Sequence, residues 1–263
     1  WDGSTGGVFA IEVTGTLTLS DDIDVSETGF RGGDRLPADP SVPTDNCVFG
    51  LVTGYATGTG NFYDYPSNNL AVEKGQGIAI AATTQDGGRA PIANAGGGGG
   101  YNASGGGGGG SYAEGGDGGR SNTSSATCSG DQASTPGIGG FGLSASGYTS
   151  GNTRVFLGGG GGSGNNGAGQ YYNCSTCRGR RGGGIAIITA GTLASDGGSI
   201  STNGEVGVGT SLGAGGGGGA GAIILNVSNY DNTNGAIAVS ADGGDGGYTD
   251  GSAEGAAGGG GGG

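Results

Sequence analysis

The chain has 263 residues, 75 of them glycine, and a formal net charge of −13 at pH 7. Such an acidic chain lacks the basic face that nucleic-acid binding rewards, and histidine, the commonest general base and metal ligand, does not occur in it. Glycine and proline are frequent enough for low-complexity disorder to be the default expectation. An ordered chain of this composition must be held together by something other than a large apolar core.

Short strands recur along the chain in a repeat that reads glycine, a strand of alternating β-branched residues, a polar turn and a second short strand. In the first repeat, Phe9, Ile11 and Val13 fall on one face of the strand, as period-two alternation requires. Helical spacing is absent, and glycines interrupt every window long enough for a helix, so we expect no α-helix. The repeats lie at residues 6–34, 75–97 (a weaker copy) and 182–244 (two copies).

Five glycine runs follow or separate these repeats. With no Cβ, such runs can adopt the extended polyproline-II helix and pack side by side through N–H···O and Cα–H···O bonds between runs. An isolated run could not do this, so the β repeats must bring the runs together. The runs are residues 96–100, 105–110, 158–162, 215–219 and 258–263.

The repeats are too short to bury their own apolar faces and must stack on one another. The sequence therefore predicts a single all-β domain over residues 1–263, a parallel β-helix or β-solenoid with long glycine-rich loops packed as polyglycine-II helices. A two-sheet sandwich is the alternative. Outside the repeats we expect a less repetitive loop region, a glycine-rich excursion and a glycine-rich tail, at residues 35–74, 98–181 and 245–263.

Two resemblances follow from these segments. The stretch GGGIAIITAGTLASDGGSISTNGEVGVG and the later GAGGGGGAGAIIL resemble the glycine-rich repeats of large bacterial surface and secreted proteins, which are read as right-handed β-helices. The segments GGGGGYNASGGGGGGSY and FLGGGGGSGNNGAGQYY are similar to the tip adhesins of T-even-type phage tail fibres. That second resemblance implies a polyglycine-II bundle carrying variable recognition loops, although the clear strand pairs depart from the phage pattern.

The four cysteines are Cys47, Cys128, Cys174 and Cys177. A redox role for the Cys-x-x-Cys pair would need a lowered thiol pKa and normally a helix, and a zinc site would need a second close pair. In a chain with a small core they are most simply two structural disulfides formed in an oxidising compartment. Of the three pairings we favour one that joins the loops of Cys47 and Cys128 to the loop of Cys174 and Cys177.

No catalytic residue, cofactor or enzyme activity is predicted. Some β-helix enzymes cleave polysaccharides with aspartate and arginine, but here these residues are better explained as a solvated turn at the end of a strand. The candidates for such a site are Asp21, Asp22, Asp24, Arg31, Asp34 and Arg35. The segment ADGGDGGYTDG resembles the calcium-binding glycine–aspartate repeats of secreted toxins, although its last aspartate comes one position late. That likeness makes Asp242, Asp245 and Asp250 calcium candidates, with turn residues as the alternative.

Three further groups of residues are candidates for surface contacts. The arginines of RGRR, residues 178–181, are expected to supply a local counter-charge or an interface element. Sequons that a glycosylating host could use occur at Asn102, Asn122, Asn173 and Asn226. Tyrosines that flank glycine runs either contact a sugar or partner subunit or close the edges of the packed glycines. They are Tyr101, Tyr112, Tyr148, Tyr171 and Tyr172.

No segment has the run of apolar residues needed to span a membrane, and a chain that begins at Trp1 is expected to be a processed, extracellular or cell-surface protein. The leading hypothesis is a self-assembling structural subunit of an extracellular filament or surface layer, whose partners are copies of itself. Its terminal glycine run, residues 258–263, is expected to enter a neighbour's lattice. The alternative is an adhesin whose loops at 46–69 and 121–151 recognise a surface glycan or receptor, and a polysaccharide-cleaving enzyme comes third.

Overall fold

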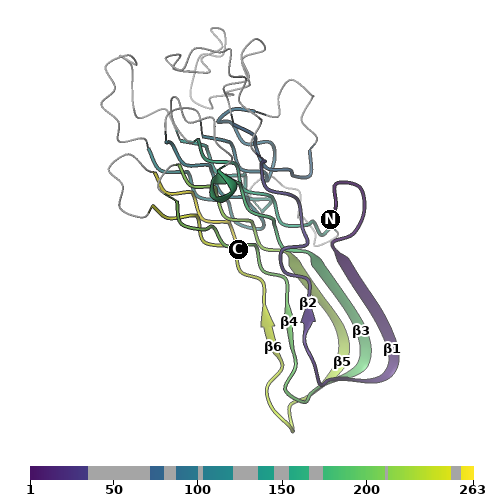
Figure 1. Ribbon diagram of the computed structural model, residues 1–263. Helices are drawn as coiled ribbons and strands as arrows, with labels where there is room; N and C mark the ends of the chain where they lie inside the picture. The colour runs from purple at the N-terminus through teal and green to yellow at the C-terminus, as the bar shows by residue number, and fades with distance from the viewer. Residues whose placement is uncertain are drawn as a thin grey trace, which may run out of the picture.

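The computed structural model describes residues 1–34, 72–79, 87–99, 103–120, 136–144, 154–165, 174–210, 213–249 and 256–263. Strands occupy one end of the molecule and extended glycine-rich segments the other (Figure 1). The described elements are β1 (Val8–Leu19), β2 (Ile23–Asp24), the 3-10 helix η3 (Ser175–Cys177), β3 (Ile185–Ser195), β4 (Ser199–Ser201), β5 (Ala222–Asp231) and β6 (Ala238–Ser240). No α-helix occurs in these ranges, as the sequence predicts.

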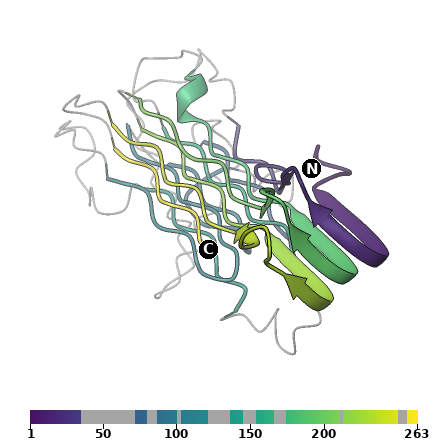
Figure 2. The ribbon, with the colours of Figure 1, turned by 90° about the horizontal axis from the view of Figure 1, so that it is seen from below.

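The strands form two sheets, ordered β1-β3-β5 and β2-β4-β6, in which every pair is parallel. Each long strand is followed by a turn and a short strand of the other sheet, and we call each such unit a rung. Figure 2 shows the three rungs stacked one upon another. In the second rung the turn passes through Gly197, whose φ of +95° is one that glycine adopts readily. The predicted all-β class with parallel strands is confirmed.

A small apolar core lies between the two sheets. Leu19, Ala186, Ile188, Leu193 and Ile200 form it, and the last four belong to the second rung and are 0% exposed. Alternation places Ala186 and Ile188 on the inward face of β3 and shifts by one residue before Leu193, so the inward face of this strand does not follow from a single period-two pattern. This cluster lies in the rungs, whereas buried apolar side chains elsewhere in the described chain, such as Val72, Leu143 and Leu157, stand apart from it, so the rest of the described chain must be held mainly by other means.

That other means is a set of extended segments joined by backbone hydrogen bonds, which we call the glycine lattice. Along residues 105–110, successive N–H groups donate to three different neighbouring segments in rotation. The N–H groups of Gly106 and Gly109 both donate to one segment, at Ala214 and Gly217. The bonding pattern thus repeats every three residues, as in the extended helix expected of glycine runs. The lattice comprises segments 29–34, 72–77, 94–99, 104–110, 115–119, 137–141, 158–165, 177–184, 204–207, 213–221, 243–247 and 256–263.

Segment 158–165 shows how an interior lattice position is satisfied. Its N–H groups donate to three neighbouring segments and its carbonyls accept from three others, so six segments surround it. The acceptor segments are 177–183, 104–110 and 73–76, and the donor segments are 30–33, 96–99 and 213–219. Backbone groups that water would otherwise solvate are thereby paired with protein on every side.

Residues larger than glycine occur in and beside the lattice at positions where their polar atoms make hydrogen bonds to backbone groups. Asn94 is 0% exposed, and its Oδ1 accepts a hydrogen bond from the Ile78 N–H at 2.9 Å. Its Nδ2 lies 3.3 Å from the Leu157 carbonyl oxygen, to which it donates. Arg89 is buried too, and its Nε donates to the Pro136 carbonyl at 2.7 Å. Burial lowers the pKa of Arg89 to about 10, an effect that the nearby carboxylate of Asp117 opposes.

Two sequence expectations differ from the structure. The described residues of the weaker repeat, 75–79 and 87–97, form isolated bridges and lattice segments instead of a sheet strand, and residues 80–86 lie outside the described ranges. The terminal run, residues 258–263, lies in the lattice of its own chain, because the N–H groups of Gly259 and Gly262 donate to the carbonyls of Gly106 and Gly109. The expectation that this run enters a neighbour's lattice is therefore wrong.

Close approach makes the lattice intolerant of any side chain at most of its positions. A Cβ on Gly161 would overlap the carbonyl oxygen of Gly216, whereas a Cβ on Gly15 in β1 meets nothing within 4 Å. We expect Gly161→Ala to lower the free energy of unfolding by about 1–3 kcal/mol, the usual cost of overpacking. Urea denaturation followed by circular dichroism measures this. Gly15→Ala is the matched control, expected to change stability by less than about 0.5 kcal/mol; equal losses in both variants would contradict the close-packed lattice.

Candidate functional site

The two outer rungs leave the apolar core open at both ends of the stack. Strand register places Ile11, Ile188 and Leu225 in one column that crosses all three rungs. The middle member is 0% exposed, while Ile11 and Leu225 are only partly buried. Each outer side chain therefore has a stacked neighbour on one side only, whereas the middle side chain has one on both sides.

A second column repeats this arrangement in the other sheet. Ile23, Ile200 and Val239 are aligned, with Ile200 at 0% exposure and Val239 at 53%. Large apolar side chains are thus exposed at the end of the stack as well as buried inside it. Exposed apolar surface of this kind marks a surface that gains from association.

The outer strands also present backbone edges. Among the described residues, no strand pairs with the outer edge of β1 or of β5. These strands have 12 and 10 residues, and long unpaired edges are templates for further strand pairing. β3 pairs with β1 across a register shift between Val13 and Thr16, and β5 has the same residue spacing as β3. Both outer edges thus belong to long strands whose inner edges are already paired with β3.

Polar groups also form hydrogen bonds between the rungs, and Asn203, which follows β4 of the middle rung, has partners on both sides. The backbone N–H of Asn203 donates to Ser26 Oγ at 3.0 Å, and its Nδ2 donates to Ser240 Oγ at 3.0 Å. Its Oδ1 accepts from the Asp242 N–H at 2.8 Å. The side chain and backbone of Asn203 thus link the first rung to the third.

Three of the aspartates considered for a catalytic site make local structural contacts. Asp22 Oδ1 accepts hydrogen bonds from both the N–H and the hydroxyl of Ser199, each at 2.8 Å. The pKa of Asp24 lies below its ordinary value because Ser26 donates to the carboxylate. Asp34 is paired with Arg178 at 2.8 Å, and Arg35 lies outside the described residues. These contacts place Asp22 and Asp24 in rung turns and Asp34 in an ion pair.

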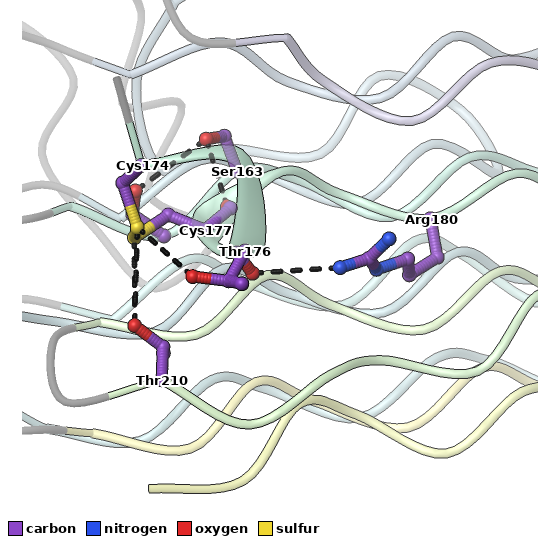
Figure 3. The surroundings of a disulfide bond; sticks show 7 residues. Ser163, Cys174, Thr176, Cys177, Arg180 and Thr210 are labelled. Atoms are coloured by element: carbon purple, nitrogen blue, oxygen red, sulfur yellow. Dashed lines mark hydrogen bonds between the residues drawn. A yellow bond between two sulfur atoms is a disulfide. The ribbon is translucent and has the colours of Figure 1, made fainter.

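The cysteine pairing differs from the expectation. Cys174 and Cys177 are bonded to each other across η3, with Cα atoms 5.2 Å apart (Figure 3). The pairing that joined them to the loops of Cys47 and Cys128 is therefore wrong, because the tight 3-10 turn brings the two sulfurs together locally. Cys177 is 0% exposed, and both sulfurs contact Thr210 Oγ1. Cys47 and Cys128 lie outside the described residues.

The RGRR segment supplies counter-charge, as one of its two interpretations predicts. Arg178 pairs with Asp34, and Arg180 Nη1 lies 3.0 Å from Glu205 Oε1. Glu205 also accepts the Arg181 N–H at 2.9 Å. The segment therefore ties residues that follow β2 and β4 to the approach to β3.

The remaining candidates are placed as follows. Tyr112 is 67% exposed, and Asn226 is exposed on β5, where alternation with Leu225 and Val227 directs it away from the core. Asp242 and Asp245 are exposed, and the described residues contain no group of three or more potential metal-ligating side chains. Other candidates lie outside the described ranges: Tyr101, Tyr148, Tyr171, Tyr172, Asn102, Asn122, Asn173 and Asp250.

Comparison of the chain with protein-family models, with curated proteins and with solved structures gave no match. Within the described ranges, no helix has the length and apolar character that crossing a membrane requires.

The local disulfide can be tested directly by peptide mapping. Trypsin cleavage after Arg154 and Arg178 yields one peptide that contains both Cys174 and Cys177. We expect this peptide, prepared without reductant, to be lighter by two hydrogens than after reduction, because the sulfurs are bonded within it. A peptide that links either residue to Cys47 or Cys128 would contradict the local pairing. Reduction is expected to cost about 2 kcal/mol of stability, since the closed loop is short.

Proposed function

We propose that this protein is a secreted structural subunit that assembles head to tail into an extracellular filament or surface layer. In this proposal each copy contributes three rungs to a continuous β-solenoid, and its polyglycine-II lattice runs alongside. The observation that carries the proposal is the column of Ile11, Ile188 and Leu225, which is fully buried in the middle and open at both ends.

The partner that best fits an open end is the opposite end of another copy. Stacking Leu225 of one copy against Ile11 of the next extends the column by the same step that separates the rungs. The parallel ladder would continue with it, across the same one-residue register shift that joins β1 to β3, because β5 has the spacing of β3. An interface that joins two different surfaces of the same chain leaves a free surface at each end of the assembly. Such an interface generates a ring where the rotation between copies closes, and an open filament where it does not.

Assembly would also compensate for the small core of this chain. A folded chain that buries little apolar surface is marginally stable by itself, and burial between copies adds to its stability. The partly buried side chains of the outer rungs are the ones that would bury the most additional apolar surface on assembly. They are Ile11, Leu17, Ile23 and Val25 of the first rung and its flank, and Ile223, Leu225, Val227 and Ile237 of the third.

The proposal is tested with variants that block one end each. Ile11→Arg should block the first-rung end and Leu225→Arg the third-rung end, because each places a charge where the next copy must pack. We expect the wild-type protein to form filaments at high concentration, seen by negative-stain electron microscopy. Each variant alone should stay monomeric, and a mixture of the two should give a dimer by analytical ultracentrifugation, since each retains one intact end.

The control is Val155→Arg, which changes a side chain that is 40% exposed and lies outside the strands. It should assemble as the wild type does. Wild-type protein that stays monomeric at high concentration would refute the filament proposal. Variants that still polymerise while folded by circular dichroism would show that the rung ends are not the interface.

The alternative, an adhesin, is favoured by one separate observation. Lattice register places the residues that flank several undescribed segments at the same level of the bundle: Gly99 bonds to Ser163, Asn165 to Ser104, and Gly213 to Asn165. The chain therefore enters and leaves the described structure at one end of the lattice repeatedly. Residues 46–69 and most of 121–151, the expected recognition loops, lie outside the described residues.

A glycan-array screen of the wild-type protein tests this alternative. Specific binding by protein that remains monomeric would favour the adhesin over the filament. Assembly without binding to any glycan would leave the structural role as the better explanation.

A further inference from the structure

An arginine-lined pocket lies among the lattice segments that follow β2 and β4 and that precede β3. It has a volume of about 290 Å³ and is lined by four arginines, Arg31, Arg178, Arg180 and Arg181. The chain contains only nine lysines and arginines against a net charge of −13. Nearly half of its cationic side chains therefore meet at one place, although they come from two segments far apart in the sequence.

The acidic side chains of the pocket do not neutralise this cluster. Asp34, Glu73 and Glu205 line the same pocket, so the arginines exceed the carboxylates by one. Asp34 is engaged by Arg178 and Glu205 by Arg180. Within the described residues, the guanidinium groups of Arg31 and Arg181 make no ion pair, and both residues are exposed and line the pocket.

Arg180 adds a second, independent observation. Its side chain is only 12% exposed, and its Nε is buried without a hydrogen-bond partner among the described residues. A buried guanidinium N–H without a partner is costly, and such groups are normally satisfied by protein or by a bound ligand. Figure 3 shows its guanidinium directed toward the Thr176 carbonyl, to which Nη2 donates, and Nη1 donates to Glu205, so Nε is the nitrogen left without a partner in the described chain.

We propose that this pocket is a binding site for a small oxyanion, either free or carried as the carboxylate or sulfate of an acidic monosaccharide. Arginine forks match planar and tetrahedral oxyanions with paired, charge-assisted hydrogen bonds. The volume is at the small end of ligand pockets, which suits one sugar ring or a single ion. The inference does not depend on assembly, because no residue of β1 or β5 lines the pocket.

The test is isothermal titration of the full chain at low ionic strength, where screening is weak. The probes are sodium glucuronate, sodium sulfate and neutral glucose. We expect the anions to bind and glucose not to bind. Arg31→Gln and Arg181→Gln should each weaken binding about tenfold, since each removes a charge-assisted contact while altering only an exposed side chain.

Arg154→Gln is the matched control, because it removes the same charge from an exposed arginine that does not line the pocket. Its affinity should equal that of the wild type. Binding of both anions would assign the site to oxyanions in general, and binding of glucuronate alone would assign it to acidic sugars. Absence of binding by either anion, or equal weakening by Arg154→Gln, would overturn the proposal.

Discussion

The close backbone contact between glycine-rich segments is the constraint on which the rest of this structure depends. Segment 158–165 can have six hydrogen-bonded neighbours only because almost none of its residues carries a side chain that would hold those neighbours apart. Backbone groups, which usually pair within one helix or sheet, here pair between segments remote in the sequence. The composition that would otherwise indicate disorder is what allows the packing.

The rungs and the lattice have complementary roles. A lattice of nearly identical segments contains little information about which segment should lie next to which, and a shift in register would change few contacts. The rungs supply that information, because Ile188, Leu193 and Ile200 fit between two sheets in only one register. Buried polar residues such as Asn94 add further fixed points, since their hydrogen bonds would be lost in any other arrangement.

The sequence predicts the rungs well and the contacts between distant segments poorly. Phe9, Ile11 and Val13 alternate with exposed residues, so their strand and its inward face follow from the pattern. Glycine has no side chain to alternate, and nothing in residues 105–110 indicates that they lie between segments 94–97 and 214–217. The expected pairing with Cys47 and Cys128 is wrong because four cysteines in a chain with a small core do not reveal that a single 3-10 turn closes the Cys174–Cys177 bond locally. Arg31 and the RGRR segment likewise line one pocket because glycine-rich lattice segments lie side by side, and the side-chain pattern of those segments does not predict which of them are neighbours.

The threefold rotation of hydrogen bonds along each segment also restricts how such a chain can change in length. Inserting one residue into segment 105–110 would turn every later N–H by a third of a turn, away from its acceptor and toward the wrong neighbour. Inserting three would restore the direction of every bond and simply lengthen the bundle. Length variation in these segments is therefore confined to multiples of three residues. Backbone geometry sets this restriction, and it does not depend on which side chains the chain carries.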